Sequence, residues 1–130
     1  MVGSFFAALL ILSLLLYLPL PSHGFGMPAN WNYQKELQVY ELIQSQNLNN
    51  YNIANLVYDP VAPVQKYLHA KNNKNYDSAN YATNTYLFVI GSEEEVNTTW
   101  AYEVNTFTPR PLLQRWPIDK QRSLFLFERN

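Results

Sequence analysis

The chain has 130 residues, a formal net charge of −1 and no cysteine. The missing cysteines exclude disulfides, thiol catalysis and cysteine-ligated metal sites, and the lack of a basic excess argues against nucleic acid as a partner. Only four glycines are present, too few for a phosphate-cradling loop, so no cofactor is expected. Ten Tyr, three Trp and fifteen Asn are typical of a recognition surface, although a compositional bias of the genome is an equal alternative.

The N-terminal segment is apolar and uncharged. Phe5 to Leu18 would form a helix of about 21 Å, shorter than the roughly 30 Å of a bilayer core, and this length favours a signal peptide. We expect residues 1–24 to be the signal peptide, cleaved after Gly24, with an anchor across residues 2–20 as the alternative. The protein would then be periplasmic, extracellular or membrane-anchored, with residues 25–130 as one small domain.

The first element after the leader is a helix over residues 33–46, with Asn32 as its N-cap. Apolar side chains recur at steps of three and four and mark the buried face. The main members of this stripe are Tyr33, Leu37, Tyr40 and Ile43. Glu36 and the other polar side chains fall mostly outside it, so we assign them to the solvent side.

A strand, a second helix and a loop are expected next. Residues 53–58 form a short apolar run, which we assign to a strand. Asp59 and Pro60 suit the N-cap and first position of a helix over residues 60–71. The Asn-rich residues 71–84 predict an exposed loop, which carries Tyr76 and Tyr81.

The second half predicts a β-hairpin and a last strand. Residues 85–90 and the alternating residues 96–104 would pair through a loop at residues 92–95, which places Trp100 on the core face. Prolines make residues 108–117 an extended connection, and residues 123–129 are apolar on both faces, typical of a covered strand. The expected fold class is therefore α+β, with two short helices packed on an antiparallel sheet of three to four strands.

The acidic stretch Glu93-Glu94-Glu95 is the densest group of charges in the chain. At a hairpin tip it is interpreted as a hydrated turn, and a cation site would need Asp77 and Asp119 from other loops. Asn97-Thr98-Thr99 is an N-glycosylation sequon that we expect to face solvent.

Catalytic constellations are sparse. His69 is the single histidine after the leader, and without partners it is interpreted as a surface or structural residue. Six carboxylates are candidates for a hydrolytic pair, but no spacing selects two of them. They are Glu36, Glu41, Asp59, Asp77, Glu103 and Asp119. We therefore assign no catalytic residue and no metal ligand.

A binding role is the favoured hypothesis. Trp31 and Trp116 lie in irregular, proline-flanked segments and are expected at an interface, as are Tyr76 and Tyr81. The sequence thus predicts a small exported or membrane-anchored protein without enzymatic activity, whose partner is another protein. A structural subunit of a membrane or envelope assembly and a small carboxylate-dependent hydrolase are the alternatives.

One family resemblance adds a further alternative. The order of helix, strand, hairpin with an acidic tip and the proline-tryptophan stretch PRPLLQRWP resembles that of the cystatins over residues 26–116. In cystatins a glycine segment, a central hairpin and a proline-tryptophan loop enter a cysteine-protease cleft, so the resemblance implies protease inhibition. The family's central Gln-x-Val-x-Gly motif is absent, and the second helix would be an insertion.

Overall fold

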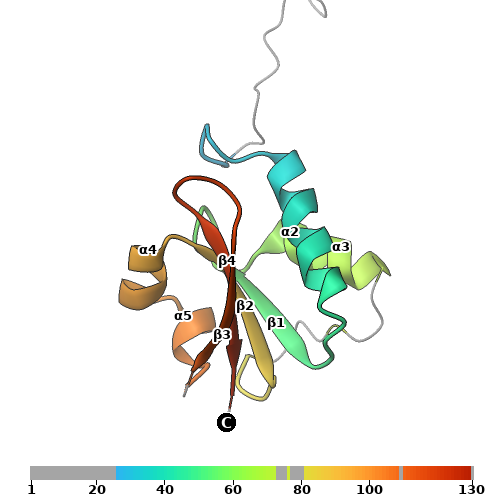
Figure 1. Ribbon diagram of the computed structural model, residues 1–130, viewed down its shortest axis with the longest axis vertical. Coiled ribbons are helices and arrows are strands. Elements are labelled where there is room, and N and C mark those ends of the chain that lie inside the picture. Colours follow the sequence, from blue (N-terminus) through green and yellow to red (C-terminus); the bar gives the residue numbers. More distant parts are fainter. Residues whose placement is uncertain (1–25, 73–75, 77–80, 109, 130) are drawn as a thin grey trace, which may run out of the picture.

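The computed structural model describes residues 26–72, 76, 81–108 and 110–129. Over these residues the chain forms four helices and four strands, which confirms the α+β class (Figure 1). In chain order the elements are α2 (Tyr33–Ser45), β1 (Tyr51–Asn55), α3 (Pro63–Asn72), β2 (Tyr86–Gly91), α4 (Glu93–Thr98), α5 (Tyr102–Asn105), β3 (Leu112–Pro117) and β4 (Ser123–Glu128).

The four strands form one mixed sheet in the order β1-β2-β4-β3. β1 and β2 are parallel, with Ile53 opposite Phe88, whereas β4 is antiparallel to both of its neighbours. The prediction of a purely antiparallel sheet is therefore wrong. A parallel neighbour requires a long crossover connection, and the chain from Asn55 to Tyr86 provides it through α3.

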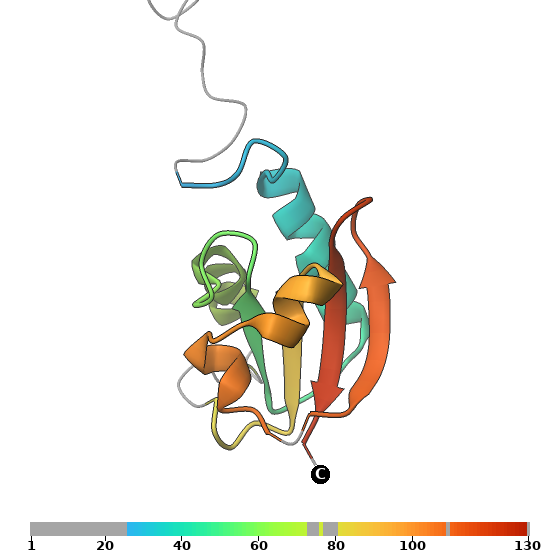
Figure 2. The ribbon, with the colours of Figure 1, turned by 90° about the vertical axis from the view of Figure 1, so that its left-hand side faces the viewer.

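Helices cover both faces of the sheet. α2 and α3 lie on one side and α4 and α5 on the other, as two perpendicular views show (Figures 1 and 2). Alternate residues of each strand supply the two cores, because successive side chains point to opposite faces. On the α2–α3 side Phe88 and Ile90 pack with Trp31, and on the α4–α5 side Val89 packs with Phe125.

Helix α2 begins as predicted. Asn32 is its N-cap, and the side-chain oxygen accepts a hydrogen bond from the Lys35 backbone N–H at 3.1 Å. The buried stripe differs from the predicted one, since it consists of Glu36, Val39 and Ile43. Tyr33 is exposed instead, so the helix is rotated relative to the prediction and carries a carboxylate into the interior.

The segment from β1 to α3 is shifted relative to the prediction. β1 begins at Tyr51 rather than at residue 53, and α3 begins at Pro63 rather than at Pro60. Asp59 holds the preceding turn, where its carboxylate accepts from the Val61 N–H and its carbonyl from the Ala62 N–H. The proline at the first helical position is thus Pro63. The preference for proline at this position holds, but three residues later than predicted.

The predicted hairpin is wrong in its second half, because residues 93–98 and 102–105 are helical. Ser92 and Glu95 form a capping box: the Ser92 hydroxyl accepts from the Glu95 N–H, and the Glu95 carboxylate accepts from the Ser92 N–H. Three glutamates in the first turn also suit the positive end of the helix dipole. Trp100, expected in the core, is 93% exposed in the link between α4 and α5.

The C-terminal strands form a hairpin at one side of the sheet. β4 lies between β2 and β3 and is largely buried, which confirms the prediction of a covered strand. Part of the predicted extended connection, Leu112–Pro117, is edge strand β3, whose register shifts between Leu112 and Gln114. β3 is mostly exposed, unlike β1 at the opposite edge.

The predicted leader lies outside the described residues, and so do residues 73–75 and 77–80 of the predicted loop at residues 71–84, while residues 71 and 72 belong to α3. Within the described part, no helix has the length and hydropathy needed to cross a bilayer.

Candidate ligand-binding cleft

A cleft of about 240 Å³ lies between α4 and the β3–β4 hairpin. Val96 and Asn97 of α4 form one wall, and Phe125 and Phe127 of β4 form the floor. The two phenyl rings are nearly parallel, with centroids 6.3 Å apart. Leu112, about half exposed at the start of β3, also lines the cleft. Phe125, Phe127 and Val96 are buried, so Leu112 is the apolar side chain of the lining that is substantially exposed.

Two arginines give the cleft a cationic side. The Arg115 guanidinium lies over the Phe125 ring at 5.1 Å, donates through Nε to Ser123 Oγ at 3.0 Å and through Nη1 to Glu93 Oε2 at 2.9 Å. Arg110 reaches back to α4, where Nη2 donates to the Val96 carbonyl at 3.3 Å. Arg110 Nη1 is buried and has no hydrogen-bond partner within the described structure.

Exposed aromatic side chains lie on the same side of the sheet as the cleft. Trp100 and Tyr102 are 93% and 67% exposed, although both are large enough to contribute to a core. Backbone hydrogen bonds hold this turn, because the Val104 and Asn105 N–H groups both donate to the Ala101 carbonyl. Trp100 therefore projects from a link held by hydrogen bonds, and Tyr102 projects from the first residue of α5.

The α2–α3 side contains a buried carboxylate that the sequence reasoning placed in solvent. Glu36 is fully buried, and its Oε1 accepts from Trp31 Nε1 at 2.7 Å, Tyr58 OH at 2.8 Å and Asn55 Nδ2 at 3.2 Å. Gln65 Nε2 donates to Oε2 at 2.6 Å. Neutral dipoles thus replace water around the charge, as burial of a carboxylate requires. Burial and the neighbouring Glu36 charge raise the pKa of Tyr58 well above its usual value.

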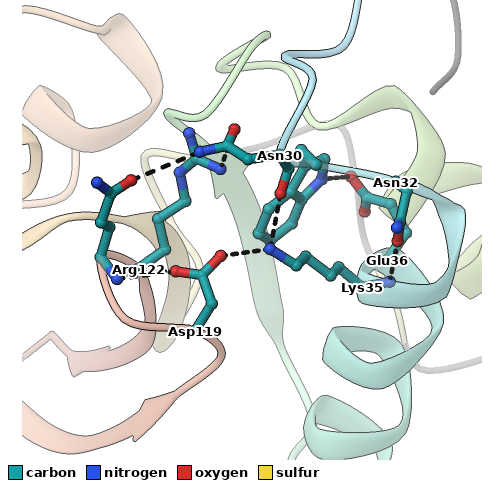
Figure 3. A network of polar contacts seen from close by, with 8 residues as sticks. Asn30, Asn32, Lys35, Glu36, Asp119 and Arg122 are labelled. Carbon is teal, nitrogen blue, oxygen red and sulfur yellow. Dashed lines mark hydrogen bonds and ion pairs between the residues drawn. The ribbon is translucent and has the colours of Figure 1, made fainter. Parts of the chain in front are cut away.

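A partly exposed polar network continues from this carboxylate toward the β3–β4 turn (Figure 3). Lys35 Nζ pairs with Asp119 Oδ2 at 2.5 Å and donates to the Asn30 carbonyl, while Arg122 Nη1 donates to Asn30 Oδ1 at 3.0 Å. The Lys35 and Arg122 cations each lie 5.5 Å from the Trp31 ring centroid. These contacts connect the segment before α2 to the β3–β4 turn. Asp119 therefore has a structural role as the ion-pair partner of Lys35.

His69 is buried between α3, α2 and β1. Its Nδ1 lies 2.8 Å from Tyr51 OH and 3.1 Å from Gln44 Nε2, while its Nε2 is buried without a hydrogen-bond partner in the described part of the chain. Because an amide nitrogen only donates, Nδ1 accepts and the proton resides on Nε2. Burial lowers the pKa of His69 to about 4, so the ring is neutral at physiological pH.

The four residues predicted at an interface are not brought together on one surface. Trp31 is fully buried, which makes the expectation of exposure wrong, because its ring packs in the core and its N–H is used by Glu36. Tyr81 is also buried and donates to the Ile53 carbonyl. Trp116 is half-buried against Phe88, and Tyr76 packs half-buried beside Tyr51.

The structure places the predicted glycosylation site on the surface, but it does not form the predicted acidic hairpin tip. Asn97 is exposed on α4 at the wall of the cleft. Glu95 caps its own helix and Glu93 pairs with Arg115, so the acidic stretch is the start of a helix rather than a hairpin tip. Asp77 lies outside the described residues, and the described residues contain no cluster of side chains suited to hold a metal ion.

The residues that now define the cleft were missed in the sequence. The period-two alternation of residues 96–104 predicts a strand, whereas the Ser92-x-x-Glu95 signature at the start of this segment marks a helix start. With α4 misassigned, no pattern indicated that Arg110 and Arg115 would converge. No family model, curated protein or solved structure matches the chain.

Proposed function

We propose that this protein is an exported or membrane-anchored binding protein without enzymatic activity, and that it docks another protein on its α4–α5 side. The docking surface consists of Trp100, Tyr102 and the cleft beside α4. The observation that carries the proposal is Trp100, whose side chain is 93% exposed although it stands in a hydrogen-bonded link between two helices.

The exposed rings of Trp100 and Tyr102 favour contact with a partner protein. Trp and Tyr dominate binding hot spots because they bury a large area with few rotatable bonds and keep a polar group for the rim. The cleft beside α4 adds the half-exposed Leu112 and two arginines, another residue type enriched in interfaces. A protein that offers an apolar group and an acidic group would complement both parts of this surface.

Export is the part of the proposal that rests on the N-terminal sequence. Residues 1–24 act as a signal peptide, or residues 2–20 remain as an anchor and place the partner beside a membrane. In a eukaryotic host Asn97 is the candidate glycosylation site, since its sequon lies on an exposed part of α4; because Asn97 lines the cleft, docking there requires this residue to be unmodified. The mass and N-terminal residue of the protein from its native source test both statements.

Site-specific photo-crosslinking tests the docking surface. A photoreactive phenylalanine at position 100 is expected to give one discrete adduct in cells of the source organism, and mass spectrometry identifies the partner. The matched control is the same group at Tyr67, which is 65% exposed on α3. The partner, purified separately, should then bind the wild-type protein and lose about tenfold or more in affinity with Trp100→Ala.

Two results would contradict the proposal. One is an equal set of adducts from positions 100 and 67, which would mean random collision. The other is a purified partner whose affinity is unchanged by both Trp100→Ala and Tyr102→Ala, which would place its binding elsewhere.

A further inference from the structure

We propose that the cleft beside α4 is an oxyanion-binding site that recognises a carboxylate or phosphate group attached to an apolar body. As a statement about the docked partner, this rests on the proposed function, because the group would belong to that protein. For the cleft itself, the proposal depends on the two arginines and on the half-exposed Leu112 beside them.

Arg110 provides the first reason. Its guanidinium is held against α4 by one long hydrogen bond to the Val96 carbonyl, and its buried Nη1 lacks any acceptor among the described residues. A charged donor that has lost water and found no acceptor is unfavourable. Because Nη1 is buried, an oxyanion in the cleft supplies the missing acceptor once the Arg110 side chain turns toward it, and the fork of a guanidinium matches the two oxygens of a carboxylate or phosphate.

Arg115 provides the second reason, since its orientation is fixed before any ligand arrives. Stacking on Phe125 and the bond from Nε to Ser123 set the plane of the guanidinium. Its partner Glu93 has a side chain that is 68% exposed, and such pairs are weak in water. A ligand oxyanion can therefore displace Glu93 or share Arg115 with it through the remaining nitrogen, Nη2.

The apolar lining defines the other half of the ligand. Phe125, Phe127 and Val96 line the cleft but are only 3–6% exposed, whereas Leu112 is half exposed, so an apolar group joined to the anion would rest mainly on Leu112. The cleft, at about 240 Å³, exceeds the roughly 150 Å³ of an engineered cavity that holds benzene. A single aromatic ring with one acidic substituent therefore fits both the size and the chemistry.

Titration of the purified full-length chain by nuclear magnetic resonance tests this site. Four probes separate the two halves of the ligand: phenylacetate and phenyl phosphate carry both, inorganic phosphate lacks the ring, and benzyl alcohol lacks the charge. The side-chain Nε–H signals of Arg110 and Arg115 are expected to shift with the first two probes. Their affinities should exceed those of the last two by about tenfold or more. Carboxylate and phosphate ligands are distinguished by which of the first two probes binds more tightly.

Variants separate the arginines from the general charge of the protein. Arg110→Gln and Arg115→Gln should each weaken phenylacetate or phenyl phosphate by about tenfold, because each removes a charged donor. Lys120→Gln removes the same charge from an exposed position in the β3–β4 turn and should change the affinity by less than about twofold. Arg110→Lys, which keeps the charge but loses the fork, should fall between the wild type and Arg110→Gln.

The proposal is overturned if no probe shifts the arginine signals, if inorganic phosphate binds as tightly as phenyl phosphate, or if Lys120→Gln weakens binding as much as Arg110→Gln. Failure of the docking proposal looks different. In that case the small probes still bind in the cleft, whereas the partner found by crosslinking binds Arg110→Gln as well as the wild type.

Discussion

Gln65 Nε2 donates to two oxygens of Glu36 at once, the backbone carbonyl at 2.7 Å and the carboxylate Oε2 at 2.6 Å. A single amide on α3 thereby satisfies a buried charge and fixes α3 against α2. The other donors to Glu36 come from the end of β1, the turn after it and the segment before α2. One carboxylate therefore joins four parts of the α2–α3 side.

Glu36→Gln should destabilise the protein although the side chains have nearly the same shape. The new amide group turns a donor toward Gln65 or toward Trp31 and Tyr58, and leaves buried donors without an acceptor. We expect a loss of about 2–3 kcal/mol in the free energy of unfolding. Urea unfolding followed by tryptophan fluorescence measures it. Glu41→Gln, an exposed position on the same helix, is the control and should change stability by less than about 0.5 kcal/mol.

Stability should depend on pH through His69. Burial lowers the pKa of His69 to about 4, compared with 6.5 in the unfolded chain. Between these values the unfolded state binds more protons, so stability falls as pH decreases from about 6.5 to about 4 and levels off below. The total contribution is about 3 kcal/mol. Unfolding measured across this range should become flatter in His69→Gln, and parallel profiles would contradict the assignment.

The Lys35–Asp119 ion pair should make the stability of the protein depend on pH in a more acidic range than His69 does. Burial alone would raise the pKa of Asp119, but hydrogen bonds from Lys35 Nζ and from the Gln121 and Arg122 N–H groups lower it overall. The stabilisation is present above the unfolded carboxyl pKa and is lost as pH falls through the lower folded value. Asp119→Asn should cost about 1 kcal/mol at neutral pH, because the pair is partly exposed. The difference should vanish in strong acid, which thermal unfolding at both pH values checks.

Replacement by phenylalanine should destabilise the protein at Trp31 but not at Trp100. Trp31→Phe removes the donor to Glu36 and leaves space in the core, so a loss of about 2–3 kcal/mol is expected. Trp100→Phe should stay within about 0.5 kcal/mol, since the side chain is almost fully in water. Fluorescence adds a second check, because Trp100 should be quenched by iodide and Trp31 should not. Equal quenching of both would contradict the burial assignments.

The sequence predicted best those elements whose local signals and burial agree. Asn32 before a helical pattern predicted the start of α2, and the apolar run from Ser123 predicted a covered strand. The succession of strand, helix and strand from residue 53 to residue 90 also contains the signature of parallel strands. The predicted hairpin did not agree with this signature, because it gave β2 an antiparallel partner in the segment that follows β2.

The rest could not be predicted because tertiary contacts override local patterns. A glutamate on a helix is normally placed in water, and the burial of Glu36 becomes favourable through four donors, three of which lie 19 to 29 residues away in the sequence. Trp100 alternates with apolar residues as a core strand would, yet the capping box at Ser92 and Glu95 selects a helix and turns the ring outward. The cleft depends on the second effect, since Val96 and Asn97 form its wall as residues of helix α4.

The free edge of β3 has a consequence for the behaviour of the protein at high concentration. Exposed strands with leucines are templates on which identical chains polymerise, and Leu112 and Leu113 are both about half exposed. Pro111 and Pro117 bracket this edge and have no N–H to donate, and the register shift after Leu112 interrupts the ladder between them. We therefore expect these features to weaken edge-to-edge pairing between copies of the chain, even though Leu112 and Leu113 are exposed.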